Sequence, residues 1–269
     1  MVYGFCRLLL AACLAVSGTG IAAVDSVYLE ELTSTELAAG IRGGHTTVII
    51  PIGGTEQNGP HMALGKHNLR VHLLASRIAR SLGNAYVAPV LAYVPQGRID
   101  PPTEHMRFAG TISIPEPVFE AVVASAARSL RQHGFRDVVL IGDHGGYQEA
   151  LRRVAISLNR DWAKTRDRTH FIDAYYRATQ TRYAASLKAA GLSEAQIGVH
   201  AGSADTSLQL ALAPDTVRTA LLAQAAERGR SAGTHGDPRA SSAALGQAGI
   251  DAVVQDTVAA IRAAVSSPR

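Results

Sequence analysis

Short apolar runs alternate with amphipathic segments along the chain. The runs predict buried strands, because short continuous apolar stretches are typical of parallel sheets. They lie at Thr47 to Ile52, Ala85 to Leu91, Asp137 to Ile141 and His170 to Ala174, of which the last is the least apolar. Between them, apolar residues recur every three or four positions, which predicts helices. These patterns are Val71-Leu74-Ile78-Leu82 before Gly83, Phe119-Val122-Ala126-Leu130 before Gly134, and Leu151-Val154-Leu158.

This alternation favours an α/β fold in which helices cover both faces of a largely parallel sheet. The chain of 269 residues, 47% of them hydrophobic, is long enough to bury one core. No stretch rich in Pro or Ser divides it, so we expect a single domain over residues 24–269. The net charge of +4 comes from scattered basic residues, and we therefore expect no nucleic-acid partner.

The first 23 residues have the pattern of a signal peptide. Arg7 precedes the apolar run Leu8 to Val16, and Ala22 and Ala23 provide a small-residue cleavage site. The run is too short to cross a bilayer, so we expect an exported protein, periplasmic or secreted, with no stable membrane span. An alternative is lipoprotein anchoring through Cys13, which ends a Leu-Ala-Ala-Cys box.

Candidate metal ligands in the mature chain are histidines and carboxylates, because Cys6 and Cys13 both lie in the predicted signal peptide. Such side chains occur among glycines in two segments that follow predicted strands, Gly53 to His67 and Gly142 to Tyr147. A third polar segment is His200 to Ser207. Since sites in α/β sheets lie outside the carboxyl ends of the strands, we expect one shared site. The alternative is polar loops with incidental histidines.

These segments resemble the signature of the creatininase (creatinine amidohydrolase) family. The similar stretches are Pro51 to Gly65, Thr103 to Ile112, Gly142 to Gly146, His200 to Ser207 and Gly236 to Pro238. Their order and rough spacing agree with the family from about Leu32 to about Gly246. The resemblance implies a three-layer α/β/α fold with a mostly parallel sheet, a homo-oligomer, and hydrolysis of an amide, often cyclic or a formamide, at two divalent metals.

The metal ligands of the family are only partly present in this chain. By position, Glu56 and His144 match ligands of the first metal. Asn58 stands where the family usually has a histidine for the second metal, and His67 stands where it has a bridging aspartate. Neutral imidazole is a poor bridge, because it offers one lone pair to one metal. We therefore expect Glu56, His67 and His144 to hold one zinc ion per chain, with manganese or iron as alternatives.

Two further residues are candidates for catalysis by the same resemblance. His200 resembles the family's general acid, which protonates the leaving nitrogen, and the alternative is a loop residue bonded to backbone. Asp205 occupies the position of a family glutamate and is one methylene shorter. It is expected to bind the metal, to act as the general base, or to orient a ligand imidazole. Glu104 and His105 lie in a family-like segment that lines the pocket or contacts a neighbouring subunit.

The predicted function is hydrolysis of a C–N bond in a small cyclic amide or formamide by metal-activated water. The first alternative is another metal hydrolase, either a lactonase or a small-peptide hydrolase. The second is a catalytically inactive exported binding protein, because Asn58 and His67 depart from the family's ligands. In each case the expected partner is a small molecule.

Overall fold

The computed structural model describes Met1 and residues 25–267, so the predicted signal peptide lies, apart from Met1, outside the described residues. The strands are β1 Thr47–Ile52, β2 Ala85–Val87, β3 Asp137–Gly142 and β4 Arg168–Phe171. The helices are α1 Ser34–Arg42, α2 Lys66–Leu82, α3 Glu116–Gln132, α4 Gln148–Asp161, α5 Ala174–Ala178, α6 Ala184–Ala189, α7 Glu194–Ile197, α8 Ser203–Leu212, α9 Leu222–Arg228 and α10 Ala243–Ser266. A π-helical turn, Thr179–Tyr183, joins α5 to α6.

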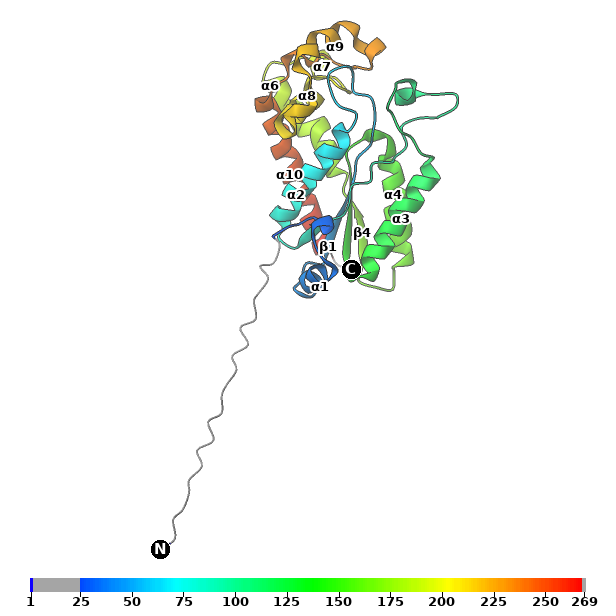
Figure 1. Cartoon of the computed structure of the whole chain (residues 1–269), viewed down its shortest axis with the longest axis vertical. Coiled ribbons are helices and arrows are strands. Elements are labelled where there is room, and N and C mark those ends of the chain that lie inside the picture. Colours follow the sequence, from blue (N-terminus) through cyan, green and yellow to red (C-terminus); the bar gives the residue numbers. More distant parts are fainter. Residues whose placement is uncertain (2–24, 268–269) are drawn as a thin grey trace.

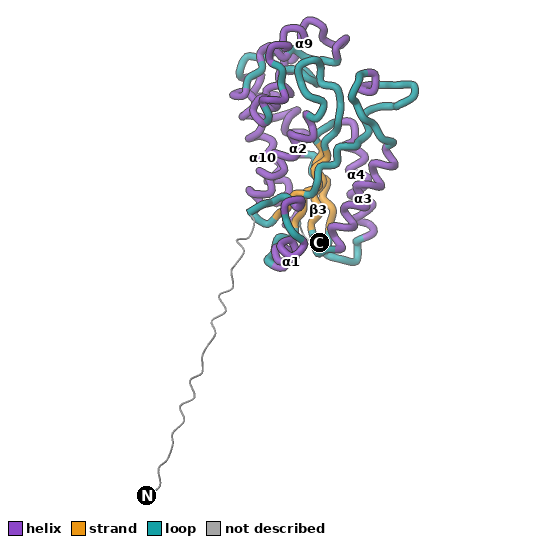
Figure 2. Tube along the Cα trace, in the orientation of Figure 1, coloured by secondary structure: helices purple, strands orange, loops and turns teal. Residues whose placement is uncertain are grey.

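The strands form a parallel sheet in the order β2-β1-β3-β4, with helices on both faces (Figures 1 and 2). Alternate residues of β1 point to opposite faces, as the pleat of a strand requires. Val48 and Ile50 pack toward α3 and α4, whereas Ile49 packs toward α2 and α10. The predicted three-layer α/β/α architecture with a parallel sheet is therefore confirmed.

Three of the four predicted strands have different bounds in the structure. β3 extends one residue further, to Gly142. β2 ends at Val87, although Leu91 N–H still donates to the Pro51 carbonyl at 3.0 Å. The strand predicted over His170 to Ala174 begins two residues too late and ends three residues too late. β4 is Arg168–Phe171, and the chain after Ile172 turns directly into α5.

The predicted buried face of α3 was right at Phe119 and wrong at Val122, while Ala126 and Leu130 are partly buried against the core. Phe119, Val123 and Ala127 are fully buried, whereas Val122 is 41% exposed. In a segment of alanine and valine, two adjacent stripes satisfy the same helical spacing, and only packing selects between them. The α2 pattern was right, since Val71, Leu74 and Ile78 are buried and Gly83 ends the helix with a φ of +81°.

A close contact between two helices positions one of the polar segments. Gly246 of α10 lies against the Ser207 carbonyl of α8, where any Cβ would overlap that oxygen, so glycine lets the two helices approach closely. This contact holds α8 and the segment before it against the body of the domain.

Every helix within the described part of the chain is too short or too polar to span a membrane.

Candidate active site

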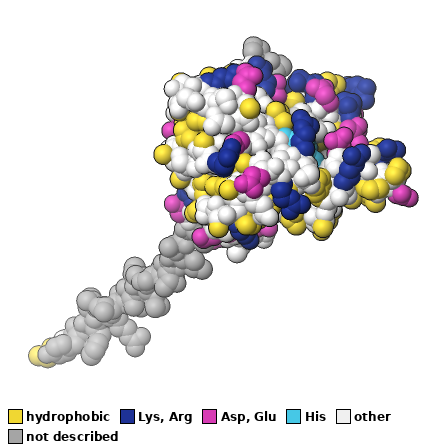
Figure 3. All heavy atoms as spheres, turned by 90° about the horizontal axis from the view of Figure 1, so that it is seen from above, with side chains coloured by type: hydrophobic (Ala, Val, Ile, Leu, Met, Phe, Trp, Pro, Cys, Tyr) yellow, Lys and Arg dark blue, Asp and Glu magenta, His cyan; other side chains and the backbone are white. Residues whose placement is uncertain are grey.

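The polar segments meet where β1 and β3 end. These strands pair in register up to Ile52 and Gly142, so the chain leaves both at the same edge of the sheet. Glu56 follows β1, His144 follows β3, and His67 lies in the first turn of α2. Figure 3 shows histidine side chains between charged side chains on the face above this edge. The structure thus brings Glu56, His67 and His144 together, with ligand atoms within 4.8 Å of one another.

The Glu56 carboxylate is the centre of the site and is completely buried. Its Oε1 atom lies 2.7 Å from Nε2 of His67, and its Oε2 atom lies 3.3 Å from Nε2 of His144. Oε2 has no hydrogen-bond partner among the residues that the structure describes. Burial raises the pKa of Glu56, but the charge and hydrogen bond of His67, together with Lys66, hold that pKa well below its ordinary value. The group is therefore a carboxylate with a free oxygen.

Asp143 orients His67 from the side opposite Glu56. Its Oδ2 atom lies 2.5 Å from Nδ1 of His67, and its two oxygens also accept from Arg70 Nε at 3.0 and 2.8 Å. Tyr175 donates its hydroxyl to Oδ1 at 2.8 Å. Burial raises the pKa of Asp143, yet Arg70 and His67 lower it on balance. A carboxylate that accepts from Nδ1 of an imidazole directs its Nε2 atom toward a metal. This role was not predicted for Asp143 from the sequence.

His144 is a neutral imidazole beside the free oxygen of Glu56. Burial lowers the pKa of His144 to about 4. Its Nδ1 atom accepts from Gly146 N–H at 3.0 Å, which places the ring proton on Nε2 in the metal-free protein. If His144 held a metal through Nε2, its ring proton would lie on Nδ1, the atom that now accepts from Gly146.

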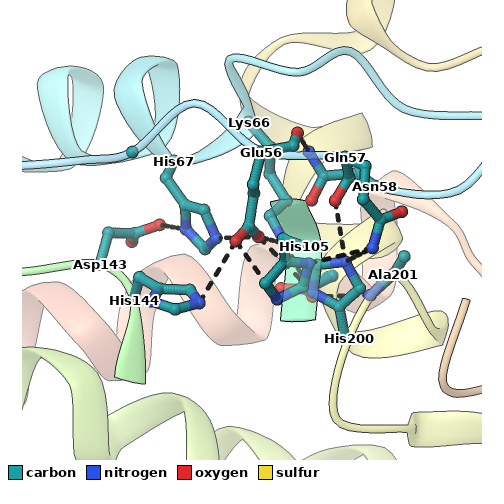
Figure 4. A network of polar contacts seen from close by, with 12 residues as sticks. Glu56, Gln57, Asn58, Lys66, His67, His105, Asp143, His144, His200 and Ala201 are labelled. Atoms are coloured by element: carbon teal, nitrogen blue, oxygen red, sulfur yellow. Dashed lines mark hydrogen bonds and ion pairs between the residues drawn. The ribbon is translucent and has the colours of Figure 1, made fainter. Parts of the chain in front are cut away.

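Two more histidines approach Glu56 from the other side (Figure 4). Nε2 of His105 lies 3.6 Å from Oε2, and Nδ1 of His200 lies 3.5 Å from Oε1. Their ring centroids are 4.5 Å apart. Glu56, His105 and His200 make a second group whose ligand atoms lie within 4.8 Å of one another. His105 therefore belongs to the site, and the only signal for it in the sequence was its family-like segment.

Gln57 gives these two rings opposite tautomers. Its Oε1 atom accepts from Gly59 N–H at 3.0 Å, so its Nε2 atom is the donor that faces Nδ1 of His105 at 3.0 Å. His105 then carries its proton on Nε2. Nε2 of His200 lies 3.0 Å from the backbone carbonyl of Gln57 and donates to it, which leaves a lone pair on Nδ1. The pocket thus contains one imidazole donor and one imidazole acceptor.

The backbone is strained beside both of these histidines. Glu104, which precedes His105, has a φ of +47°, and Ala201, which follows His200, has a φ of +55°. Positive φ is uncommon for residues other than glycine, and such strain clusters at functional sites. Within the described chain, these are the only residues other than glycine with positive φ.

Asp205 lies beside Lys66 and Arg70 and is absent from both candidate ligand groups. Its oxygens accept from Lys66 Nζ at 3.1 Å, Arg70 Nη1 at 2.8 Å and Ala201 N–H at 2.9 Å. Burial raises the pKa of Asp205, but the two cations hold it well below its ordinary value. Of the three roles expected for this residue, these contacts favour positioning over ligation, and its catalytic role stays a prediction.

Asn58 holds the loop after β1 rather than facing the four histidines. Its Nδ2 atom donates to the carbonyls of Glu56 at 2.9 Å and Ala63 at 3.0 Å. It belongs to neither group of candidate metal ligands within residues 25–267. The position at which the family usually has a second-metal histidine therefore serves the backbone in this chain.

Comparisons with known proteins agree with this geometry. A family model described as Creatininase: Creatinine amidohydrolase matches residues 30–261. The mycofactocin precursor peptide peptidase of Mycolicibacterium smegmatis is 29% identical over 74% of this chain and 78% of its own length. A crystal structure of creatinine amidohydrolase (creatininase) has a TM-score of 0.76 at 23% identity, covering 91% of this chain and 100% of that chain. A mutant creatininase of the Zn-Zn type has a TM-score of 0.71 at 25% identity, covering 90% and 99%.

Proposed function

The chain belongs to the creatininase family, and we propose that it is an exported, zinc-dependent amidohydrolase that cleaves the C–N bond of a small cyclic amide or formamide. Glu56, His67 and His144 hold the metal in this proposal. The observation that carries it is the Glu56 carboxylate, fully buried and ringed by imidazoles, with Oε2 lacking a hydrogen-bond partner in the described part of the chain. A buried carboxylate oxygen without a donor is costly unless a cation completes it.

The donor set fits a zinc ion. One carboxylate and two imidazoles, with a position left for water or substrate, make a catalytic zinc arrangement. The tie between Asp143 and His67 is the type of contact that orients a metal-binding imidazole. Zinc rather than another divalent ion is proposed from these nitrogen ligands, and the similarity to a mutant creatininase of the Zn-Zn type supports it. When bound, the metal supplies Lewis acidity and lowers the pKa of a water molecule to about 7.

His105 and His200 complete the site for a substrate with an N–H group. Nε2–H of His105 can donate to a carbonyl oxygen, while Nδ1 of His200 can accept a proton. Burial lowers the pKa of His200 to about 3, so the ring is neutral near pH 7. In the proposed reaction, Nδ1 of His200 takes a proton from water as the C–O bond forms. The same atom returns this proton to the nitrogen as the C–N bond breaks, releasing an acid and an amine.

A short peptide is the second candidate substrate. The relative named as a mycofactocin precursor peptide peptidase supports it, and a peptide bond offers the same carbonyl and N–H groups as a lactam. The strained backbone beside both histidines favours an active site over a binding protein without catalysis.

An activity panel with metal analysis tests the proposal. Lactams, formamides, lactones and dipeptides are offered to the purified protein before and after treatment with a chelator. We expect one lactam or formamide to be hydrolysed, turnover to stop after chelation, and zinc to restore it. His67→Ala should lose both metal and activity, whereas His133→Ala, on an exposed histidine, should retain both.

Each contrary result has a distinct meaning in this experiment. Turnover that survives removal of the metal contradicts the metal site. Preference for a lactone or a dipeptide replaces the proposed substrate class with that alternative. A protein that keeps one zinc ion and hydrolyses no member of the panel supports the binding-protein alternative.

A further inference from the structure

A buried lysine lies at the edge of the candidate metal site. Lys66 is 1% exposed, and its Nζ atom lies 3.5 Å from Oε1 of Glu56 and 3.1 Å from Oδ2 of Asp205 (Figure 4). The next residue, His67, stands where the family usually has a bridging aspartate. An anion is thus replaced by a neutral ligand, and a cation lies beside it.

The place that Lys66 occupies is costly for a cation. Burying an ammonium group is strongly unfavourable unless it is paired. Lys66 is also the first residue of α2, where the helix dipole disfavours positive charge and Gly65 provides no side-chain cap. Its ion pairs with Glu56 and Asp205 offset this cost. The Glu56 carboxylate therefore already faces one cation in the metal-free protein.

The ammonium group lies beside the second candidate ligand group. That group consists of Glu56, His105 and His200, and it shares the Glu56 carboxylate with the first group. The Oε1 atom that Lys66 approaches lies 3.5 Å from Nδ1 of His200 and 2.7 Å from Nε2 of His67, so the ammonium group borders both ligand groups at their shared carboxylate. In addition, Nε2 of Gln57 donates to Nδ1 of His105, so the proton of that ring lies on Nε2. This Nε2 atom faces the Glu56 carboxylate. A second metal would have to displace this proton and approach the ammonium group.

The buried charges around Glu56 also disfavour a second metal ion. They are the carboxylates of Glu56, Asp143 and Asp205 and the cations of Lys66 and Arg70. With neutral histidines, these groups sum to one negative charge. One divalent ion changes the sum to one positive charge, and a second raises it to three positive charges in a buried space. Uncompensated buried charge of that size is strongly unfavourable.

We propose that the Lys66 ammonium group takes the place of a second metal ion at Glu56, His105 and His200, and so limits this chain to one metal. The inference rests on the proposed metal site at Glu56, His67 and His144. It explains how a chain of this family keeps a charge-balanced centre without the usual ligands at positions 58 and 67. It also leaves His105 and His200 free for substrate.

Metal stoichiometry tests this inference without relying on activity. The wild type and variants are loaded with excess zinc, dialysed, and measured for metal per chain by mass spectrometry. We expect one equivalent in the wild type and two in Lys66→Met, which keeps an unbranched side chain, one atom shorter, and removes the charge. Lys66→Met/His105→Ala should return to one equivalent. Lys188→Met, on an exposed lysine, should match the wild type.

A second variant without the charge at position 66 serves as a control in case Lys66→Met does not fold. Lys66→Gln removes the same positive charge but keeps a polar end group that can donate to Asp205, and it should also bind two equivalents. Circular dichroism and melting temperature establish that each variant is folded. Two equivalents in the wild type, or one equivalent in both folded neutral variants, would overturn the inference while leaving the first metal site intact. A wild type that binds no zinc would instead contradict the proposed function.

Discussion

The carboxylate of Asp143 lies 2.5 Å from Nδ1 of His67 and accepts the proton on that nitrogen. The contact directs the opposite nitrogen of the ring toward Glu56, at 2.7 Å. Asp143 is in turn held by Arg70 and Tyr175, so the imidazole is fixed by a chain of buried polar contacts. Such outer contacts set the strength of a metal site as much as the ligands themselves.

Removal of this carboxylate should weaken metal binding. Asp143→Asn keeps the shape of the side chain but loses the charge that favours a proton on Nδ1 of His67. We expect zinc affinity to fall by about 10- to 100-fold, measured by competition with a chromophoric chelator. Asp161→Asn, which breaks an exposed ion pair with Arg128, serves as the control. Equal affinity in the Asp143→Asn and Asp161→Asn variants would show that Asp143 does not orient His67.

Substitution of Gln57 should alter the histidine pair while sparing the metal. Gln57→Glu replaces the amide donor that faces Nδ1 of His105 by an acceptor, so His105 should move its proton from Nε2 to Nδ1. Loss of a donor aimed at developing negative charge lowers kcat by about 100-fold. Nitrogen NMR of the labelled imidazoles reports the tautomer directly. Zinc content should remain that of the wild type. A reduced kcat with an unchanged tautomer would contradict this role for Gln57.

Acidification should destabilise the metal-free protein before its carboxylates titrate. Burial lowers the pKa of His61 to about 4 and that of His200 to about 3, compared with about 6.5 in an unfolded chain. Between these values the unfolded state binds more protons, so the free energy of unfolding is largest above pH of about 6.5 and falls as the pH drops toward about 4. Urea unfolding of the chelated protein at pH about 7 and about 5 measures the slope.

Single variants identify the groups behind this slope. Replacing His61 or His200 by Gln should flatten the dependence of unfolding free energy on pH, because one neutral buried imidazole is removed. His133→Ala should leave it unchanged, since that side chain is exposed. A pH dependence that is equally steep in all three variants would place its origin elsewhere.

Two adjacent valines test the orientation of α3. Val123 is completely buried, whereas Val122 is 41% exposed. Val123→Ala should lower the free energy of unfolding by about 2 kcal/mol, because it leaves a cavity in the core. Val122→Ala should change it by less than about 0.5 kcal/mol. Urea unfolding of both variants provides the comparison, and equal losses would mean that the helix is rotated from this orientation.

The sequence by itself determined the α/β class and the family. The apolar run of Thr47–Ile52 is a strand with the predicted bounds, because a strand buried on both faces needs continuous apolar residues. The glycine-bordered segments around Glu56 and His144 predicted a shared site, because parallel strands end at one edge of the sheet. Membership of the creatininase family followed from the same segments and is confirmed.

Only the tertiary structure decided how the charges of the site are arranged. Asp143, Gln57 and Lys66 had no assigned roles in the sequence, because each acts through partners that are distant along the chain. His105 and His200 are likewise joined by folding alone, since 95 positions separate them, from 105 to 200. The sequence specifies local periodicity and residue chemistry. Which carboxylate meets a cation and which nitrogen carries a proton depend on packing between elements, and that packing is settled when the chain folds.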